Sequence, residues 1–388
     1  MKSTRPAVFR DERILRVVGQ LIFVLLLGAL AWYLAGNMLA NMRRQGLSLG
    51  FDFLRGTAGF DIGETLIPYS RSSTFAQAFL VGLLNTLQVS AVGIVLTTLV
   101  GFVVGVARLS RNFLVRGIAR VYIEFLRNIP LLVLLIFLYI GVFIKFPRVN
   151  QAVMLPGPVY LTNRGVALPW GEPAATFPGF LLALAVGLGL AILTGVVLER
   201  RGRASGRKPL VGGWAAGVFL AAAAVGWLLQ PSAPLTLSLP AAKGLRLSGG
   251  LVLSQEFMAL LTGLVIYTSA FVADVVRAGI QSIARGQVEA AHSLGLSGPL
   301  TLRLIVLPQA LRVIVPPLTS QYLNLTKNSS LAVAIGFPEL FHVSGTILNQ
   351  SGRTVEMITL AMATYLLISL LTSAFMNWYN QRVRLVER

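Results

Sequence analysis

The sequence predicts an all-α, polytopic membrane protein of about eight transmembrane helices. Hydrophobic residues make up 55% of the 388-residue chain and charged residues only 12%, whereas charge is about a quarter of a typical soluble domain. Eight apolar stretches are long enough, at about 20 residues each, to cross a bilayer as a helix. Lipid offers no partner to free backbone N–H and C=O groups, so we expect these stretches to be helical.

The apolar stretches follow one another along the whole chain. In order they cover residues 14–38, 75–107, 121–144, 178–198, 210–229, 256–280, 313–337 and 355–379. The first is similar to a signal peptide, but it is longer than the usual apolar signal region, and we interpret it as a retained span. Segments 41–74, 146–177 and 230–255 are rich in Pro and Gly, which favours loops or short surface helices outside the membrane.

Lys and Arg residues cluster at the ends of the apolar stretches and indicate the topology. Most of these 33 residues fall in the two terminal segments and in every second connection between spans, which lie together on one side of the membrane. Such residues are enriched in cytoplasmic loops, so both termini are predicted to be cytoplasmic. The net charge of +19 is therefore explained by topology and contact with membrane lipid, and we expect no nucleic-acid partner. The chain has no Cys, which excludes disulfides and thiolate metal sites.

One cytoplasmic connection, residues 285–312, carries a compact pattern. It contains the run Glu289, Ala290, Ala291, His292, Ser293, Leu294, Gly295 and Leu296, and it ends near Leu307-Pro308. Glycine after a short helix permits a left-handed cap, and proline resists continuation of a helix, so we expect a helix, a turn and a second helix. Spacing alone favours an amphipathic connector on the headgroups, although a short helix with small residues also suits a partner's groove.

The residues of this connection resemble a known motif. EAAHSLGLSG followed by TLRLIVLPQAL closely resembles the EAA loop of ABC-importer permeases. The preceding segment 267–282 is similar to the corresponding helix of polar amino-acid permeases, with Asp274 where Glu is more usual. RNIPLL from Arg127 resembles the Arg-Gly-Thr-Pro-Leu-Leu of that family, and KNSSLA from Lys327 resembles its Lys-x-Ser/Thr-Ser-Leu.

The resemblance covers residues 75–144 and 251–379, a five-helix core of the type I permease fold. It is closest to the histidine/glutamine/arginine type, and the elongated form resembles the Q/B-type subunit of general L-amino-acid (Aap/Bzt-like) transporters. The implied organisation has four parts. These are 1–74 with an extra helix at 14–38 and an external loop, 75–145 with two core helices, 146–250 with extra helices at 178–198 and 210–229, and 251–388 with three core helices and the EAA loop 285–312.

The resemblance implies a non-catalytic subunit of an ATP-driven importer in a bacterial inner membrane. Polar L-amino acids would move from the periplasm to the cytoplasm. The implied partners are a cytoplasmic ABC ATPase, a second permease that is a different chain, and a periplasmic amino-acid-binding protein. The chain has no G-x-x-x-x-G-K-[ST] loop, so we expect no cofactor here and assign ATP and Mg to the partner ATPase.

A lysine inside a predicted span indicates a substrate pathway. Lys327 lies in the otherwise apolar stretch 313–337, and an ionisable residue there usually faces a cavity or a partner. Ser320, Asn324, Lys327 and Asn328 recur along one helical face after a kink predicted at Pro316-Pro317, and Ser329 follows them. We expect this stripe to line a route for a zwitterion. The alternative is that Lys327 pairs with an internal carboxylate such as Asp274 and only locks helices together.

Two charged pairs lie near predicted helix ends. Asp274 and Arg277 are three residues apart, which favours a local ion pair over a gate element. Glu124 and Arg127 have the same spacing, and we assign them to interfacial anchoring, with gating as the alternative. Glu289 and His292 have metal-site spacing, but the only other His, at 342, is predicted on the opposite side of the membrane, so we expect no metal site.

Other classes of membrane protein fit less well. An ion- or proton-coupled secondary transporter would show paired helix breaks or intramembrane acids in two related halves, and we see no such duplication. A membrane enzyme would need clustered acids or His on one leaflet. The GxxxG from Gly101 to Gly105 would allow close helix packing but carries no functional assignment.

Overall fold

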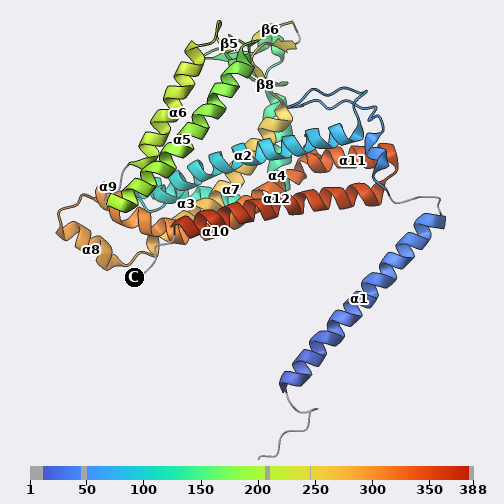
Figure 1. The fold of residues 1–388 in the computed structure, drawn as a ribbon, viewed down its shortest axis with the longest axis horizontal. Coiled ribbons are helices and arrows are strands. Elements are labelled where there is room, and N and C mark those ends of the chain that lie inside the picture. Colours follow the sequence, from blue (N-terminus) through green and yellow to red (C-terminus); the bar gives the residue numbers. More distant parts are fainter. Residues whose placement is uncertain (1–11, 45–49, 206–209, 245, 384–388) are drawn as a thin grey trace, which may run out of the picture.

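The computed structural model describes residues 12–44, 50–205, 210–244 and 246–383. Within these residues, seven helices are long and apolar enough to cross a membrane, or eight if one bent pair counts as a single span. The bundle is built around α2 (Phe75–Ala107), α7 (Gln255–Gln281), α10 (Leu307–Asn328) and α12 (Thr354–Val383), which run side by side in Figure 1. The predicted number and order of spans are confirmed.

Helices α2 and α7 form the tightest packed pair. α2 begins with a capping box in which the Thr74 hydroxyl accepts from the Gln77 N–H and the Gln77 side chain accepts from the Thr74 N–H. A Cβ on Gly101 would lie 2.5 Å from Val272 Cγ1, and one on Gly105 would lie 2.7 Å from the Ala273 carbonyl oxygen. The GxxxG therefore brings the two backbones together, because only glycine leaves room for this approach.

The second core span is broken. α3 (Phe113–Arg127) and α4 (Leu131–Ile136) meet at an angle of 105°, and a π-helical turn at Phe137–Val142 and a 3₁₀ turn at Phe143–Lys145 continue α4. The prediction of one continuous helix over 121–144 is wrong. Pro130 has no N–H to continue the hydrogen-bond ladder, and its ring disfavours helical backbone at the preceding residue, so the chain turns there.

The helical run that follows α8 starts earlier than predicted. α9 (Gly298–Thr301), a π-helical segment (Leu302–Val306), α10 and a 3₁₀ segment (Ser329–Ile335) form one apolar run that begins at residue 298 instead of 313. α10 continues through Pro316 and Pro317. A short helix that was not predicted, α11 (Leu340–Ser351), packs between α2 and α12.

The insertion contains strands as well as helices. β1 (Val153–Leu155), β2 (Val159–Thr162), β3 (Gly165–Leu168) and β8 (Leu251–Leu253) form an antiparallel sheet, while β4 (Trp170–Pro173) pairs with β5 (Leu235–Ser238) and β6 (Ala241–Lys243) with β7 (Arg246–Ser248). The prediction that segments 146–177 and 230–255 contain only loops or short helices is wrong. Tight glycine turns, such as Gly157 at φ +88°, allow strands too short to show an alternating pattern.

Two helices leave this β-rich region as a hairpin. α5 (Phe177–Ser205) and α6 (Val211–Leu228) pack chiefly on each other and project away from the strands (Figure 1). Gly226 faces the Ala183 methyl group, and Phe180 meets Trp227 edge-on with ring centroids 5.4 Å apart. The hairpin is thus a separate two-helix unit joined to the bundle through the strands.

The first helix stands apart from the bundle. None of the apolar membrane-spanning window of α1 (Glu12–Arg44) is buried, and Figure 1 shows the helix beside the other elements without packing on them. The segment after it contains a 3₁₀ turn at Asp52–Arg55 and packs through Ala58 on the start of α2 and on α11. No described part of this chain therefore packs on α1.

Candidate functional site

The EAA-like segment forms a short helix with a well-formed C-terminal cap. α8 covers Arg285–Ser293 and lies at the end of the bundle where the described chain finishes (Figure 1). Gly295 has φ +78°, its N–H donates to the His292 carbonyl, and the Leu296 N–H donates to the Ala291 carbonyl. These two bonds form a Schellman motif, which requires a left-handed residue at the position of Gly295. The predicted helix, turn and second helix are confirmed.

α8 buries Ala291, half-buries Val288 and leaves its other side chains exposed. Ala291 is buried, Leu296 is half-buried, and the helix contacts α9 and the π-helical segment before α10. The exposed members are Glu289, Ala290, His292, Ser293, Leu294 and Gly295. Leu294 is 81% exposed, which leaves a large apolar side chain in water at the tip of the helix. Such an arrangement suits docking into a groove of another protein.

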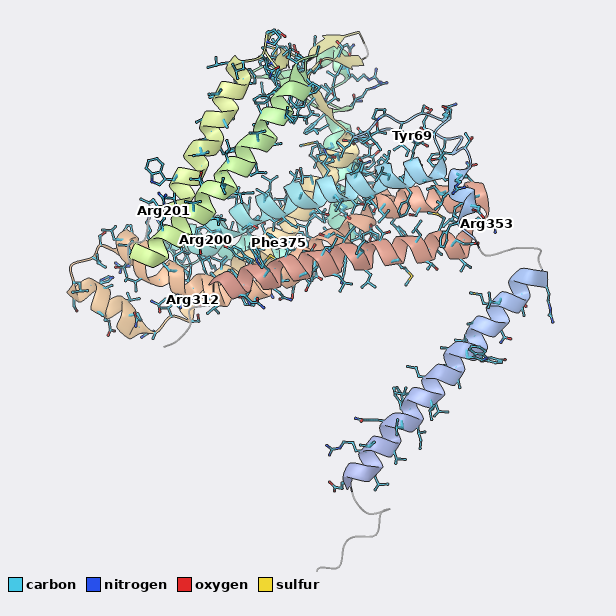
Figure 2. All side chains as sticks on the ribbon, in the orientation of Figure 1. Tyr69, Arg200, Arg201, Arg312, Arg353 and Phe375 are labelled. Carbon is cyan, nitrogen blue, oxygen red and sulfur yellow. The ribbon has the colours of Figure 1, made fainter. Side chains whose placement is uncertain are left out.

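Arginines mark the same end of the molecule. Figure 2 shows Arg200 and Arg201 at the end of α5 and Arg312 on α10, all towards α8, while Tyr69 and Arg353 lie towards the opposite end. α8 and the segment 50–74 thus lie at opposite ends of the bundle (Figure 1). The end with α8 corresponds to the side predicted as cytoplasmic.

Only some residues of the predicted polar stripe are exposed. Ser320, Asn324 and Lys327 are exposed along α10, and Asn328 is half-buried at its end. Ser329 is buried, and its hydroxyl donates to the Thr326 carbonyl over 2.8 Å. The stripe therefore brings together the first four predicted residues, whereas Ser329 faces the interior because the backbone changes to a 3₁₀ turn there.

Lys327 lines a cavity of about 540 Å³ between α10, α11 and α12. The walls are largely apolar, and the polar side chains among them are Ser330, Ser344, Tyr365 and Ser369. Within the described residues no carboxylate lies within ion-pair distance of Lys327. The alternative pairing with Asp274 is wrong, because Asp274 is bonded to two arginines.

A three-residue ion cluster joins α3 to α7. Asp274 accepts from Arg127 Nη1 at 2.9 Å and from Arg277 Nη2 at 2.8 Å, and the Arg127 guanidinium lies 5.4 Å from the centre of the Phe271 ring. The local pair of Asp274 and Arg277 is confirmed. Glu124 does not pair with Arg127 but one turn back with Arg120, at 2.7 Å, and its predicted role as an interfacial anchor stays a prediction. Arg127 instead makes a tertiary contact beside the sharp bend.

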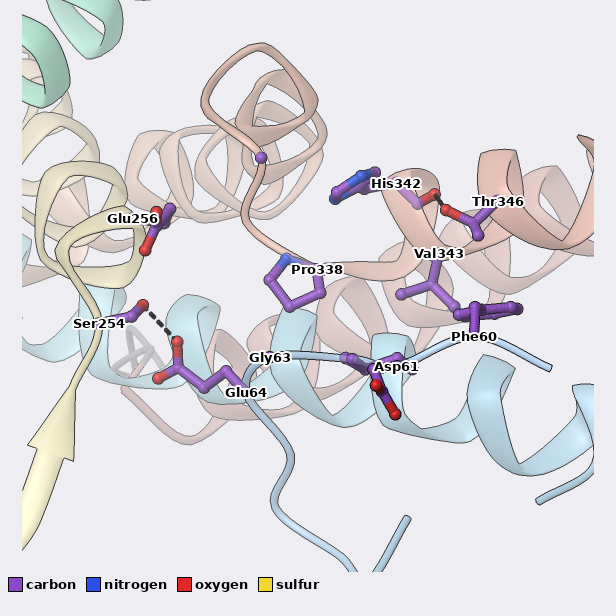
Figure 3. Close-up of a pocket in the computed structure, with 12 residues that line it drawn as sticks. Phe60, Asp61, Gly63, Glu64, Ser254, Glu256, Pro338, His342, Val343 and Thr346 are labelled. Carbon is purple, nitrogen blue, oxygen red and sulfur yellow. Dashed lines mark hydrogen bonds between the residues drawn. The ribbon is translucent and has the colours of Figure 1, made fainter. Parts of the chain in front are cut away.

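A second cavity (Figure 3) lies beside α11, which Figure 1 places at the end opposite α8. It has a volume of about 410 Å³ and is lined by segment 60–64, the start of α7, and the turn before α11. The Ser254 hydroxyl donates to Glu64, and Tyr139 donates to Glu256 at 2.9 Å. Burial raises the pKa of the Glu64 carboxyl, the Ser254 hydrogen bond opposes this, and the charge on Glu256 adds to the increase.

This cavity was not predicted from the sequence. Its parts are brought together by Asn85, which is fully buried on α2 and donates to the carbonyls of Glu64 and Pro338, each at 2.9 Å. The one sequence feature that pointed to a polar site here was an asparagine in an apolar span, since a buried amide must find hydrogen-bond partners. Those partners lie on segments remote in sequence, so the signal did not identify them.

Comparisons with a family model and with known relatives agree on one protein family. The model described as "Binding-protein-dependent transport system inner membrane component" matches residues 97–385. The general L-amino acid transport system permease protein AapQ of Rhizobium johnstonii is 43% identical over 100% of this chain and 96% of its own. The putative amino-acid ABC transporter permease protein YhdX of Escherichia coli is 43% identical over 95% of this chain and 93% of its own. The glutamate/glutamine/aspartate/asparagine transport system permease protein BztB of Rhodobacter capsulatus is 40% identical over 97% and 96%. The chain therefore belongs to the family of binding-protein-dependent transport system inner membrane components.

Proposed function

We propose that this chain is the permease subunit of an ATP-driven importer that carries polar L-amino acids across a bacterial inner membrane into the cytoplasm. The observation that carries the proposal is α8, a capped helix presented at one end of the bundle with Leu294 exposed at its tip. Nearly full-length similarity to amino-acid permeases supports the substrate class. A secondary transporter, the alternative from the sequence, would not need such a helix.

The ATPase would act on the chain through α8. Closure of the ATPase pair around ATP and Mg would displace the docked face formed by Glu289, Ala290, His292, Ser293, Leu294 and Gly295, with Ala291 and Leu296 anchoring the helix from behind. α8 contacts α9 and the π-helical segment, which continue directly into α10. A displacement of α8 would therefore reach Lys327 at the far end of α10 through a continuous rod, as in a rigid-body switch.

The substrate would pass along the exposed side of α10. We assign Ser320, Asn324, Lys327 and Asn328 to this route, and Ser329 to supporting it from behind. A free ammonium group beside a cavity of about 540 Å³ is suited to the α-carboxylate of an amino acid. The mostly apolar walls would contact the aliphatic part of the substrate.

The ion cluster of Arg127, Asp274 and Arg277 would hold the bend between α3 and α4 against α7. Opening at the α8 end would require this cluster to stretch or break, which gives it a gating role. Glu124 would remain an interfacial residue through its pair with Arg120.

The remaining assignments concern the assembly. We propose that both termini are cytoplasmic, that a second and different permease chain completes the pathway, and that a periplasmic amino-acid-binding protein delivers substrate at the end opposite α8. ATP and Mg would be bound only by the partner ATPase.

Reconstitution in vesicles tests the proposal. The chain would be co-expressed with its ATPase and second permease, and uptake of labelled amino acids would be measured with binding protein outside and ATP inside. We expect uphill uptake only when all four components and ATP are present. Uphill accumulation by this chain alone would overturn the proposal.

A further inference from the structure

We propose that α3, together with the basic linker before it, binds an anionic phospholipid in the leaflet on the α8 side. The apolar face of α3 would hold an acyl chain and the linker would hold the phosphate. The proposed function enters only in naming that leaflet as the cytoplasmic one. Three observations carry the inference: the division of α3 into distinct faces, a shallow groove on one of them, and arginines around the start of the helix that have no carboxylate partner among the described residues.

α3 is a helix with separate apolar and charged faces. It begins at a well-formed cap, where the Asn112 side chain accepts from the Leu114 and Val115 N–H groups, and it ends at the 105° bend. Ala119, Ile123 and Leu126 are buried and face the bundle, where α3 packs on α7. The bend turns α3 away from the direction of α4 by 105°.

The apolar face of α3 is not covered by any described part of this chain. It consists of Phe113, Leu114, Ile118, Val121 and Phe125, whose side chains are between 62% and 80% exposed. Five large apolar residues on one face of a single helix form a contiguous patch that needs lipid or another protein to cover it.

A groove runs over this face where Gly117 lacks a side chain. It has a volume of about 460 Å³, and its walls are Phe113, Leu114, Ile118, Val121 and Tyr122. No atom lies within 4 Å of a Cβ built on Gly117. The one polar group of the lining, the Tyr122 hydroxyl, is engaged with Ser269 Oγ at 2.7 Å and the Ile266 carbonyl at 3.1 Å. The groove is therefore apolar throughout, which suits a hydrocarbon chain.

The basic residues around the start of α3 favour an anionic headgroup. Arg108, Arg111, Arg116, Arg120 and Arg127 occur within 20 residues, against one acid, Glu124. Arg120 pairs with Glu124 and Arg127 with Asp274. Within the described residues, Arg108, Arg111 and Arg116 have no carboxylate at ion-pair distance, and Arg111 and Arg116 are exposed. Arginines at the start of a helix with an exposed apolar face match a phosphate at headgroup level.

Charge complementarity favours lipid over the second permease as the occupant. A helix of the partner would bury the apolar face but would also have to supply counter-charges for three cations, whereas a phosphate headgroup carries its own negative charge. An anionic lipid satisfies both faces together. Each arginine near an anionic membrane surface is worth roughly a fivefold preference, so two predict a roughly 25-fold enrichment of the anionic lipid.

The test uses the absence of Cys in this chain. Ile118→Cys would be labelled with a bimane fluorophore in the complete transporter, with partner cysteines replaced, and placed in nanodiscs containing phosphatidylglycerol and phosphatidylcholine. Bromine on the acyl chains of one lipid at a time quenches fluorophores that it touches. At equal mole fractions we expect brominated phosphatidylglycerol to quench several-fold more strongly than brominated phosphatidylcholine.

Matched arginine variants identify the source of the selectivity. Arg111→Gln combined with Arg116→Gln should bring the quenching ratio close to one. Arg55→Gln combined with Arg148→Gln removes the same charge from exposed positions remote from α3 and should leave the ratio unchanged. Equal quenching by both lipids in the unmodified transporter would overturn the proposal, as would absence of quenching by either, which would place the second permease on this face. ATP-dependent uptake, measured separately, reports on the proposed function alone.

Discussion

Lys327 is the residue on which the proposed substrate pathway depends most. Its ammonium group lies beside a cavity and has no carboxylate partner in the described part of the chain, and a hydrogen bond to a charged group contributes about 1.5–3 kcal/mol. Lys327→Met should therefore lower uptake, as kcat/KM, by about 10- to 100-fold. The measurement is vesicle uptake normalised to the amount of assembled complex. Lys145→Met, at an exposed position on another element, should leave uptake unchanged, and normal kinetics in the Lys327 variant would remove this residue from the pathway.

Glu64 makes a pH-dependent contribution to stability. Burial raises its pKa above the ordinary 4.5, so the folded protein holds this proton more tightly than the unfolded chain does. Stability should then fall as pH rises from 4.5 through the raised pKa, because the unfolded state binds fewer protons in that window. Glu64→Gln should flatten this dependence and raise Tm at pH 7.

Thermal unfolding of the purified transporter between pH 4 and 8 checks this expectation. Glu172→Gln, a change of an exposed carboxylate on β4, serves as the control and should not alter the pH profile. A lower Tm at pH 7 in the Glu64 variant would mean that the carboxylate is stabilised by its surroundings and would contradict the expected sign.

Individual residues differ in how far the sequence identifies their environment. Lys327 was recognisable because a cation among apolar neighbours is costly wherever it lies. Glu64 was not, because its burial depends on Asn85, Ser254 and the turn at Pro338, which come from three distant segments. Charge partners were equally hard to assign: Asp274 bonds both the predicted neighbour Arg277 and the distant Arg127.

At the scale of elements, the cap of α8 should be essential for coupling. Gly295 has φ +78°, and a β-branched residue there costs roughly 1–2 kcal/mol or more. Gly295→Val should distort the docking face, so that transport is lost and ATP hydrolysis no longer depends on substrate, while the complex still inserts. Gly157→Val imposes the same kind of strain, at φ +88°, in a turn remote from α8 and should spare coupling. Unaltered uptake in the Gly295 variant would count against docking through α8.

The contact of α2 with α7 should tolerate no side chain at its two glycines. A methyl group on Gly105 would meet the Ala273 carbonyl, which is backbone and cannot move aside. Gly105→Ala should destabilise the protein by about 1–3 kcal/mol, the usual cost of overpacking. Gly189→Ala on α5 has open space around it and should be neutral or slightly stabilising. Thermal unfolding in detergent compares the two, and an equal effect would contradict a close α2–α7 contact.

Elements were predictable where composition alone determines them. Long apolar runs gave α2, α5, α6, α7 and α12 to within a few residues in most cases, because a bilayer-length helix is the only solution for such a run. The bend before α4 depends on a single Pro among apolar residues, and the short strands have too few residues to show alternation. Both features depend on tertiary pairing, which the local pattern does not contain.

At the scale of the whole molecule, the α5–α6 hairpin should be removable. It leaves β4 and returns to β5 at adjacent points, where the Ala174 N–H donates to the Pro234 carbonyl over 2.9 Å. Replacing residues 175–233 by a short Gly/Ser turn should preserve the β4–β5 pair, the bundle and ATPase binding. Co-purification with the ATPase and the Tm of the complex check this. Loss of the complex would show that the hairpin supports the bundle or its partners.

The position of the insertion in the chain has a consequence for biosynthesis. α2 and α7 close on each other through Gly101 and Gly105, yet everything from Arg108 to Ser254 is translated between them. At about 5–20 residues per second, roughly 7–30 s pass before α7 emerges from the ribosome. During this interval the glycine-lined side of α2 is exposed in the membrane without its native neighbour. Premature pairing with another newly inserted helix is thus the characteristic risk in making this protein, and slowing synthesis across the insertion would aggravate it.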